Sequence, residues 1–127
     1  MTPVRPRDIK ADAVRVMVCD DSVVMRAALA RALESDPAVR VVARAADGKQ
    51  ALAEVQRQPV DVLVLDIEMP VMDGLTALPL LMRAAPRLRV LMASTLTTRG
   101  AEVTLQALRL GAADYVAKPS SVAGQNA

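Results

Sequence analysis

Five short apolar runs alternate with segments of helical period along this chain, and the alternation restricts the fold more than any other feature. The runs occupy residues 14–19, 39–45, 60–66, 89–94 and 114–118. Their length and their valine and leucine content are typical of strands buried on both faces of a sheet. The segments between them predict helices after Ser22, over 47–58, over 75–85 and around 101–110. The pattern therefore predicts an α/β fold with a parallel sheet, right-handed crossovers and helices on both faces.

Helix boundaries follow from single residues. Ser22 is suited to cap the first helix. Gly111 is suited to a left-handed position after the last one. Pro79 falls inside the third helical segment and is expected near its first turn, where a missing N–H is tolerated.

Composition excludes several classes of function. The 127 residues fit one domain, and the single tyrosine, with no phenylalanine or tryptophan, requires an aliphatic core. The chain has no histidine, which excludes Ser-His-Asp and Cys-His catalysis and disfavours a transition-metal site. The net charge of +2, from scattered basic residues, favours solvated helix faces over nucleic-acid binding. No apolar run is long enough for membrane insertion, and the lone Cys19 is expected in the core of a cytoplasmic protein.

Polar side chains stand at the ends of four of the predicted strands. They are Asp20, Asp21, Asp66, Ser94, Thr95 and Lys118. The carboxyl ends of parallel strands share one edge of the sheet, where open α/β sheets bind ligands. Wet strand ends would explain any one of these residues, but the whole set predicts a site.

The chemistry of this set points to phosphate and a divalent cation. Three carboxylates in one cleft are tolerable when they hold a hard cation with oxygen ligands, and Mg²⁺ is the expected ion. The Lys118 ammonium and the Ser94 hydroxyl suit phosphoryl oxygens. An aspartate beside such a metal can act as a nucleophile and form an acyl phosphate.

The stretches "VCDDS", "VLVLDIEMPVMDG", "VLMAST" and "GAADYVAKP" closely resemble the receiver domain of two-component response regulators. The resemblance implies a doubly wound, flavodoxin-like sheet of five strands in the order 2-1-3-4-5. It implies a receiver domain over 14–119, a flexible leader over 1–13, and a tail or the start of a linker over 120–127. The family's last helix is missing, so part of one sheet face is expected to be uncovered and to promote self-association or lower stability.

The resemblance also assigns roles around the phosphoryl group. Asp66 becomes the phosphoacceptor, and Asp20 and Asp21 become acidic residues of the Mg²⁺ site, Asp21 as a direct ligand and Asp20 through water. Glu68 lends its backbone carbonyl to the metal, and Lys118 contacts the phosphoryl group.

Further positions match the family's switch elements. Ser94 becomes the switch hydroxyl, ahead of its neighbour Thr95, and Pro119 is expected to follow a cis peptide bond. Tyr115 falls at the aromatic switch position, the alternative being a half-buried tyrosine of an edge strand.

A narrower resemblance links "DIEMPVMDGLTAL" and the long loop "TLTTRGAEVTLQAL" to the receiver domain of the chemotaxis protein-glutamate methylesterase. It implies that a histidine kinase phosphorylates Asp66 and that the receiver regulates a methylesterase output domain, or another protein target, that is absent from this chain. Any enzymatic activity would be limited to phosphorylation and dephosphorylation of Asp66 itself.

Two alternatives stay open. One is a stand-alone or degenerate receiver that acts as a binding module without phosphorylation. The other is a phosphohydrolase with an aspartyl nucleophile, since "DIE" at 66–68 superficially fits. The position of Asp66 on the third strand and the lack of room for a substrate-covering cap argue against the phosphohydrolase.

Overall fold

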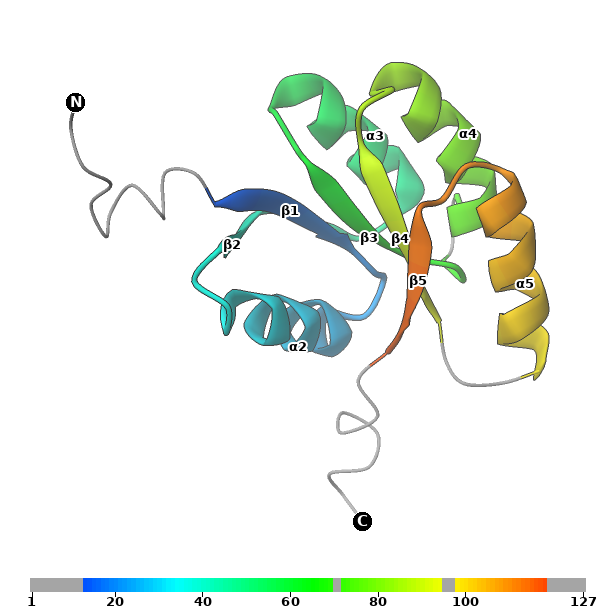
Figure 1. Ribbon diagram of the computed structural model, residues 1–127, viewed down its shortest axis with the longest axis horizontal. Coiled ribbons are helices and arrows are strands. Elements are labelled where there is room, and N and C mark those ends of the chain that lie inside the picture. The colour runs from blue at the N-terminus through cyan, green and yellow to red at the C-terminus, as the bar shows by residue number, and fades with distance from the viewer. Residues whose placement is uncertain (1–12, 70–71, 95–97, 119–127) are drawn as a thin grey trace, which may run out of the picture.

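A computed structural model describes residues 13–69, 72–94 and 98–118, and in them strands and helices alternate along the chain (Figure 1). The elements are β1 (Val14–Cys19), α2 (Val23–Glu34), β2 (Val39–Ala45), α3 (Gly48–Arg57), β3 (Val62–Asp66), α4 (Gly74–Ala84), β4 (Arg89–Ser94), α5 (Thr98–Arg109) and β5 (Asp114–Ala117). The strands form one parallel sheet in the order β2-β1-β3-β4-β5. The predicted fold class and strand order are therefore confirmed.

The two faces of the sheet are covered by different numbers of helices. Figure 1 shows α3, α4 and α5 on one face and α2 on the other. Alternation along β1 produces this division, because Met17 and Cys19 join the cluster under the three helices while Val16 and Val18 pack with Leu29 of α2. Among the described residues, α2 is the only helix on its face, and the predicted self-association through that face stays a prediction.

Local signals set most of the helix ends. The Ser22 hydroxyl accepts a hydrogen bond from the N–H of Met25 at 3.1 Å, which confirms the predicted cap of α2. Gly111 has a φ of 116°, the left-handed conformation predicted after the last helix. The helix predicted around 101–110 begins earlier, at Thr98, and the third strand begins at Val62 rather than at residue 60.

The expected position of Pro79 near the first turn is wrong. Pro79 is the sixth residue of α4, inside the helix. A proline there cannot donate a hydrogen bond to the carbonyl four residues earlier, that of Leu75. The helix continues because its neighbours Leu78 and Leu81 are completely buried against the sheet, so packing outweighs the lost bond.

Replacing Pro79 with alanine is expected to raise the free energy of unfolding by about 1–2 kcal/mol. The gain is smaller than the full cost of an interior proline because alanine leaves the unfolded chain more flexible. Urea unfolding followed by far-UV circular dichroism measures the change. Pro86→Ala is the matched control, since the exposed Pro86 lies just beyond the helix. Equal midpoints for the two variants would contradict the expectation.

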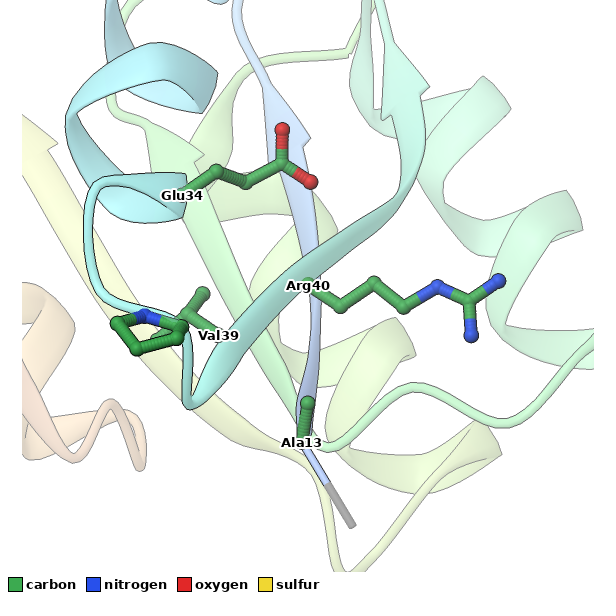
Figure 2. Close-up of a pocket in the computed structure, with 5 residues that line it drawn as sticks. Ala13, Glu34, Val39 and Arg40 are labelled. Atoms are coloured by element: carbon green, nitrogen blue, oxygen red, sulfur yellow. The ribbon is translucent and has the colours of Figure 1, made fainter. Parts of the chain in front are cut away.

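The edge strand β2 is partly protected by a side chain. The N–H of Val41 donates to Glu34 Oε2 at 3.0 Å. A carboxylate from the end of α2 therefore accepts a hydrogen bond from a backbone N–H at the edge of the sheet. Figure 2 shows Glu34, Val39, Arg40 and Ala13 around a pocket beside this strand. Ala13 precedes β1, which places the pocket at the end of the strands opposite to Asp20. None of the helices in the described part of the chain is long and apolar enough to cross a membrane.

Candidate functional site

The carboxyl ends of β1 and β3 bring three aspartates together. Asp20 and Asp21 directly follow β1, and Asp66 is the last residue of β3. One oxygen atom of each carboxylate lies within 4.8 Å of those of the other two. Asp20 and Asp66 are almost fully buried, at 1% and 2% exposure, whereas Asp21 is exposed. The predicted convergence of these carboxylates is confirmed.

Lys118 supplies the positive charge of the cluster. It follows β5, and its N–H donates to the Ser94 carbonyl at 2.9 Å, which extends the pairing with β4 by one residue. The Lys118 ammonium lies 2.7 Å from Asp66 Oδ1 and 3.3 Å from Asp20 Oδ2. Lys118 therefore extends from the end of β5 past the end of β4. Its ammonium contacts the buried carboxylates at the ends of β3 and β1.

Burial dominates the electrostatics of the cluster. It raises the pKa of Asp66 to about 6, and the charge of Asp20 acts in the same direction, although the hydrogen bond from Lys118 works against both. Burial also acts to lower the pKa of Lys118, but its hydrogen bond to Asp66 and the charges of both aspartates raise that pKa on balance. In the described part of the chain, the cluster thus places three carboxyl groups around the ammonium of Lys118.

Two buried carboxylate oxygens that accept no hydrogen bond indicate whether the cluster suits a cation. In the described part of the chain, the buried atoms Asp20 Oδ2 and Asp66 Oδ2 accept no hydrogen bond, and the 3.3 Å ion pair of Asp20 Oδ2 with Lys118 lacks hydrogen-bond geometry. Buried carboxylate oxygens without donors are costly. A hard divalent cation supplies what they lack, so the donor set fits Mg²⁺.

Backbone groups hold the two buried aspartates in place. Asp66 Oδ1 accepts the N–H of Glu68 at 3.3 Å, and Asp20 Oδ1 accepts the N–H of Ser22 at 2.9 Å. The backbone of Glu68 is therefore next to the cluster, while its side chain is exposed. Its predicted role as a carbonyl ligand stays a prediction.

Of the residues predicted to act as a switch, Ser94 and Tyr115 lie within the described part of the chain. The buried Ser94 hydroxyl lies 3.4 Å from the Thr104 hydroxyl of α5. Tyr115 lies on the edge strand β5 and is 53% exposed, which is compatible with a half-buried tyrosine of an edge strand, and its role as a switch stays a prediction. Thr95 and Pro119, with its expected cis peptide bond, lie outside the described residues.

Sequence reasoning missed two residues near the cluster. Thr104, the partner of Ser94, is ten positions further along the chain, and only its place on the buried side of α5 marks it. Arg26, on α2, donates from Nη1 to the Asp20 carbonyl at 2.6 Å. No sequence pattern predicts a hydrogen bond from a side chain to a backbone carbonyl of this kind. Cys19, by contrast, is the expected core residue, and burial raises the pKa of its thiol to about 12.

Comparisons with known proteins agree with this geometry. The model of the response regulator receiver domain matches residues 16–124. A protein-glutamate methylesterase/protein-glutamine glutaminase of Rhodospirillum centenum is 60% identical over 111 residues, which are 87% of this chain and 28% of that protein. The chain thus spans about a quarter to a third of the length of the curated relatives it matches.

Solved structures show the same likeness. The response regulator domain of Thermotoga maritima CheB has a TM-score of 0.77 and 44% identity, with 84% of this chain and 79% of that chain covered. A chain of the CheX-CheY-BeF3-Mg+2 complex from Borrelia burgdorferi has a TM-score of 0.76 and 30% identity, with 89% of this chain and 84% of that chain covered. The chain therefore belongs to the family of response regulator receiver domains.

Proposed function

We propose that this chain is the phosphorylation-activated receiver of a two-component chemotaxis system, with Asp66 as the phosphoacceptor. The observation that carries the proposal is the ion pair of Lys118 with Asp66 at 2.7 Å, inside a cluster of three carboxylates. The high identity to methylesterases favours a methylesterase domain, absent from this chain, as the regulated partner. The phosphoryl donor would be a phosphohistidine on a histidine kinase.

The proposed step is an in-line transfer. An Asp66 carboxylate oxygen attacks the phosphorus atom, a new O–P bond forms, and the N–P bond of the phosphohistidine breaks with its electron pair returning to the imidazole. Asp66 begins the reaction largely ionised at neutral pH, because its pKa is about 6. Lys118 neutralises charge on the transferred group from a position already next to Asp66.

A divalent cation completes the charge balance of the proposed site. Asp20, Asp21, Asp66 and the Glu68 carbonyl would hold Mg²⁺, which would offset the charge of the phosphoryl oxygens. Asp20 Oδ2 and Asp66 Oδ2, which accept no hydrogen bond from the described residues, support this assignment.

The proposed output is a changed protein surface on α5 and β5. Ser94 is the proposed switch hydroxyl, and its neighbour Thr104 belongs to α5, so movement of Ser94 towards a phosphoryl group would disturb that helix. Leu105 and Tyr115 expose large apolar side chains on α5 and β5. An exposed apolar surface on these elements suits a partner domain.

The test is intact mass after incubation with acetyl phosphate, with and without Mg²⁺. The expected result is a Mg²⁺-dependent gain of one phosphoryl group that disappears in Asp66→Asn. Asp36→Ala, which removes an exposed carboxylate next to the end of α2, should behave as the wild type. Modification of the Asp66→Asn variant, or no modification of a folded wild type, would refute the proposal. Steady turnover of p-nitrophenyl phosphate would instead favour the phosphohydrolase.

A further inference from the structure

Arg26 reaches back from α2 to the carboxyl end of β1. It lies in the first turn of the helix, where its own N–H donates to the Ser22 carbonyl at 2.9 Å. Its guanidinium nitrogen Nη1 donates to the Asp20 carbonyl at 2.6 Å, a short bond assisted by the arginine charge. Arg26 is partly buried.

Arg26 completes the set of bonds that fix Asp20. The N–H of Asp20 donates to the Ala45 carbonyl at 3.0 Å, and its carboxylate accepts the N–H of Ser22 at 2.9 Å. The Asp20 carbonyl has Arg26 as its partner. That carbonyl belongs to the peptide bond between Asp20 and Asp21. Because a peptide bond is planar, the bond from Arg26 helps to orient the backbone at Asp21.

Asp21 depends on this backbone for its placement. Its side chain is exposed, and within the described ranges it makes no hydrogen bond or ion pair. Even so, one of its oxygen atoms lies within 4.8 Å of those of Asp20 and Asp66. The position of the Asp21 carboxylate therefore depends on the backbone that carries it, and Arg26 bonds to the carbonyl directly before Asp21.

We propose that Arg26 is a positioning residue that holds Asp21 in place as a ligand of the divalent cation. The inference rests on the proposed function, because it concerns the same cation site. Residues that orient metal ligands typically contribute 10- to 100-fold to metal affinity. If Arg26 acted only through its charge, its removal would have the opposite effect, since a nearby cation repels Mg²⁺.

The experiment is a Mg²⁺ titration followed by the backbone amide NMR shifts of residues 19–22. Arg26→Met is expected to weaken Mg²⁺ binding by about tenfold. Arg26→Lys, which keeps the charge with a different donor geometry, is expected to weaken binding less. Arg31→Met is the matched control, because Arg31 is an exposed arginine of the same helix, and it should bind Mg²⁺ as the wild type does.

Unchanged or tighter Mg²⁺ binding by Arg26→Met would overturn the role of Arg26 and leave the proposed function intact. A wild type without saturable Mg²⁺ shifts would overturn the proposed cation site itself, and the inference with it. The amide spectrum shows whether each variant is folded. If Arg26→Met does not fold, Arg26→Lys decides, with weaker binding supporting the inference and wild-type binding refuting it.

Discussion

Replacement of Lys118 with methionine is expected to lower the free energy of unfolding by about 3–5 kcal/mol at pH 8 in a Mg²⁺-free buffer. Lys118 contacts two carboxylates that are 1% and 2% exposed, at 3.3 and 2.7 Å. Methionine keeps most of the length of the side chain but leaves both buried charges without a counter-ion. Removal of one partner from a buried ion pair costs far more than the pair itself contributes.

The loss is expected to depend on pH. Burial already raises the pKa of Asp66 to about 6, and loss of the Lys118 hydrogen bond and charge raises it further. A carboxyl whose pKa is higher in the folded than in the unfolded chain stabilises the fold as the pH falls through the folded pKa. The variant should therefore be closest to the wild type at pH 5 and furthest from it above pH 7.

Mg²⁺ should partly reverse the loss, because the cation then replaces the missing positive charge. At a concentration ten times its Kd, a ligand that binds only the folded chain adds about 1.4 kcal/mol. Urea unfolding at pH 5 and pH 8, with Mg²⁺ or with a chelator, measures each effect. Lys49→Met, at an exposed position of α3, is the control. An equal loss at both pH values would mean that packing of the lysine stem, not its charge, is what matters.

The second large effect is expected at Gly74. This glycine is the first residue of α4, and its N–H donates to the Ile67 carbonyl at 2.9 Å, which draws the helix against the end of β3. A Cβ atom at Gly74 would collide with the backbone oxygen of Asp66 and lie 3.0 Å from Ile67 Cα. Both obstacles are backbone atoms, which cannot rotate away, so Gly74→Ala is expected to cost about 3 kcal/mol.

The same change should damage the site, because the obstructing oxygen belongs to Asp66. Phosphorylation by acetyl phosphate is expected to fall even where the variant remains folded. Gly111→Ala separates sterics from conformation, since Gly111 has a positive φ but 3.7 Å of clearance from its nearest neighbour. It should cost only about 1–2 kcal/mol and leave phosphorylation intact. Similar losses for the two variants would contradict the steric explanation.

The sheet and the centre of the site were predictable because both follow from one rule. Strands of a parallel sheet in register end at the same edge, so residues at or directly after their carboxyl ends meet. Asp20, Asp66 and Lys118 are such residues, and they are within ion-pairing distance. Their positions relative to the predicted strands are enough to predict that they meet, without knowledge of side-chain geometry.

Helix α4 and the start of α5 were less predictable because tertiary packing overrides local preference. Pro79 lacks a donor wherever it stands, and only the burial of Leu78 and Leu81 explains why the helix runs through it. At α5, Gly100 interrupts the helical pattern, so the sequence indicates a start at Ala101 although the helix begins at Thr98. Local helix propensity predicts neither the helix through Pro79 nor the start of α5 at Thr98.

Contacts of the long side chains were not predictable at all. Arg26 could have extended into solvent like Arg31, the other arginine of α2, and its bond to the Asp20 carbonyl depends on the path of the chain between β1 and the helix. The hydroxyl of Thr104 likewise meets Ser94 only because α5 packs against β4. Such contacts arise only once the elements are packed together, and no regular spacing of residues in the sequence indicates them.

The exposed position of Tyr115 gives the molecule a built-in optical reporter. Tyr115 is the only aromatic residue of the chain, so all of its intrinsic ultraviolet emission comes from one point on β5, three residues before Lys118. An emission change on phosphorylation would locate a rearrangement at that strand without any label. In an unfolding experiment, emission would follow β5 alone while circular dichroism follows every helix. Coincident transitions would show that this edge strand unfolds together with the rest of the sheet.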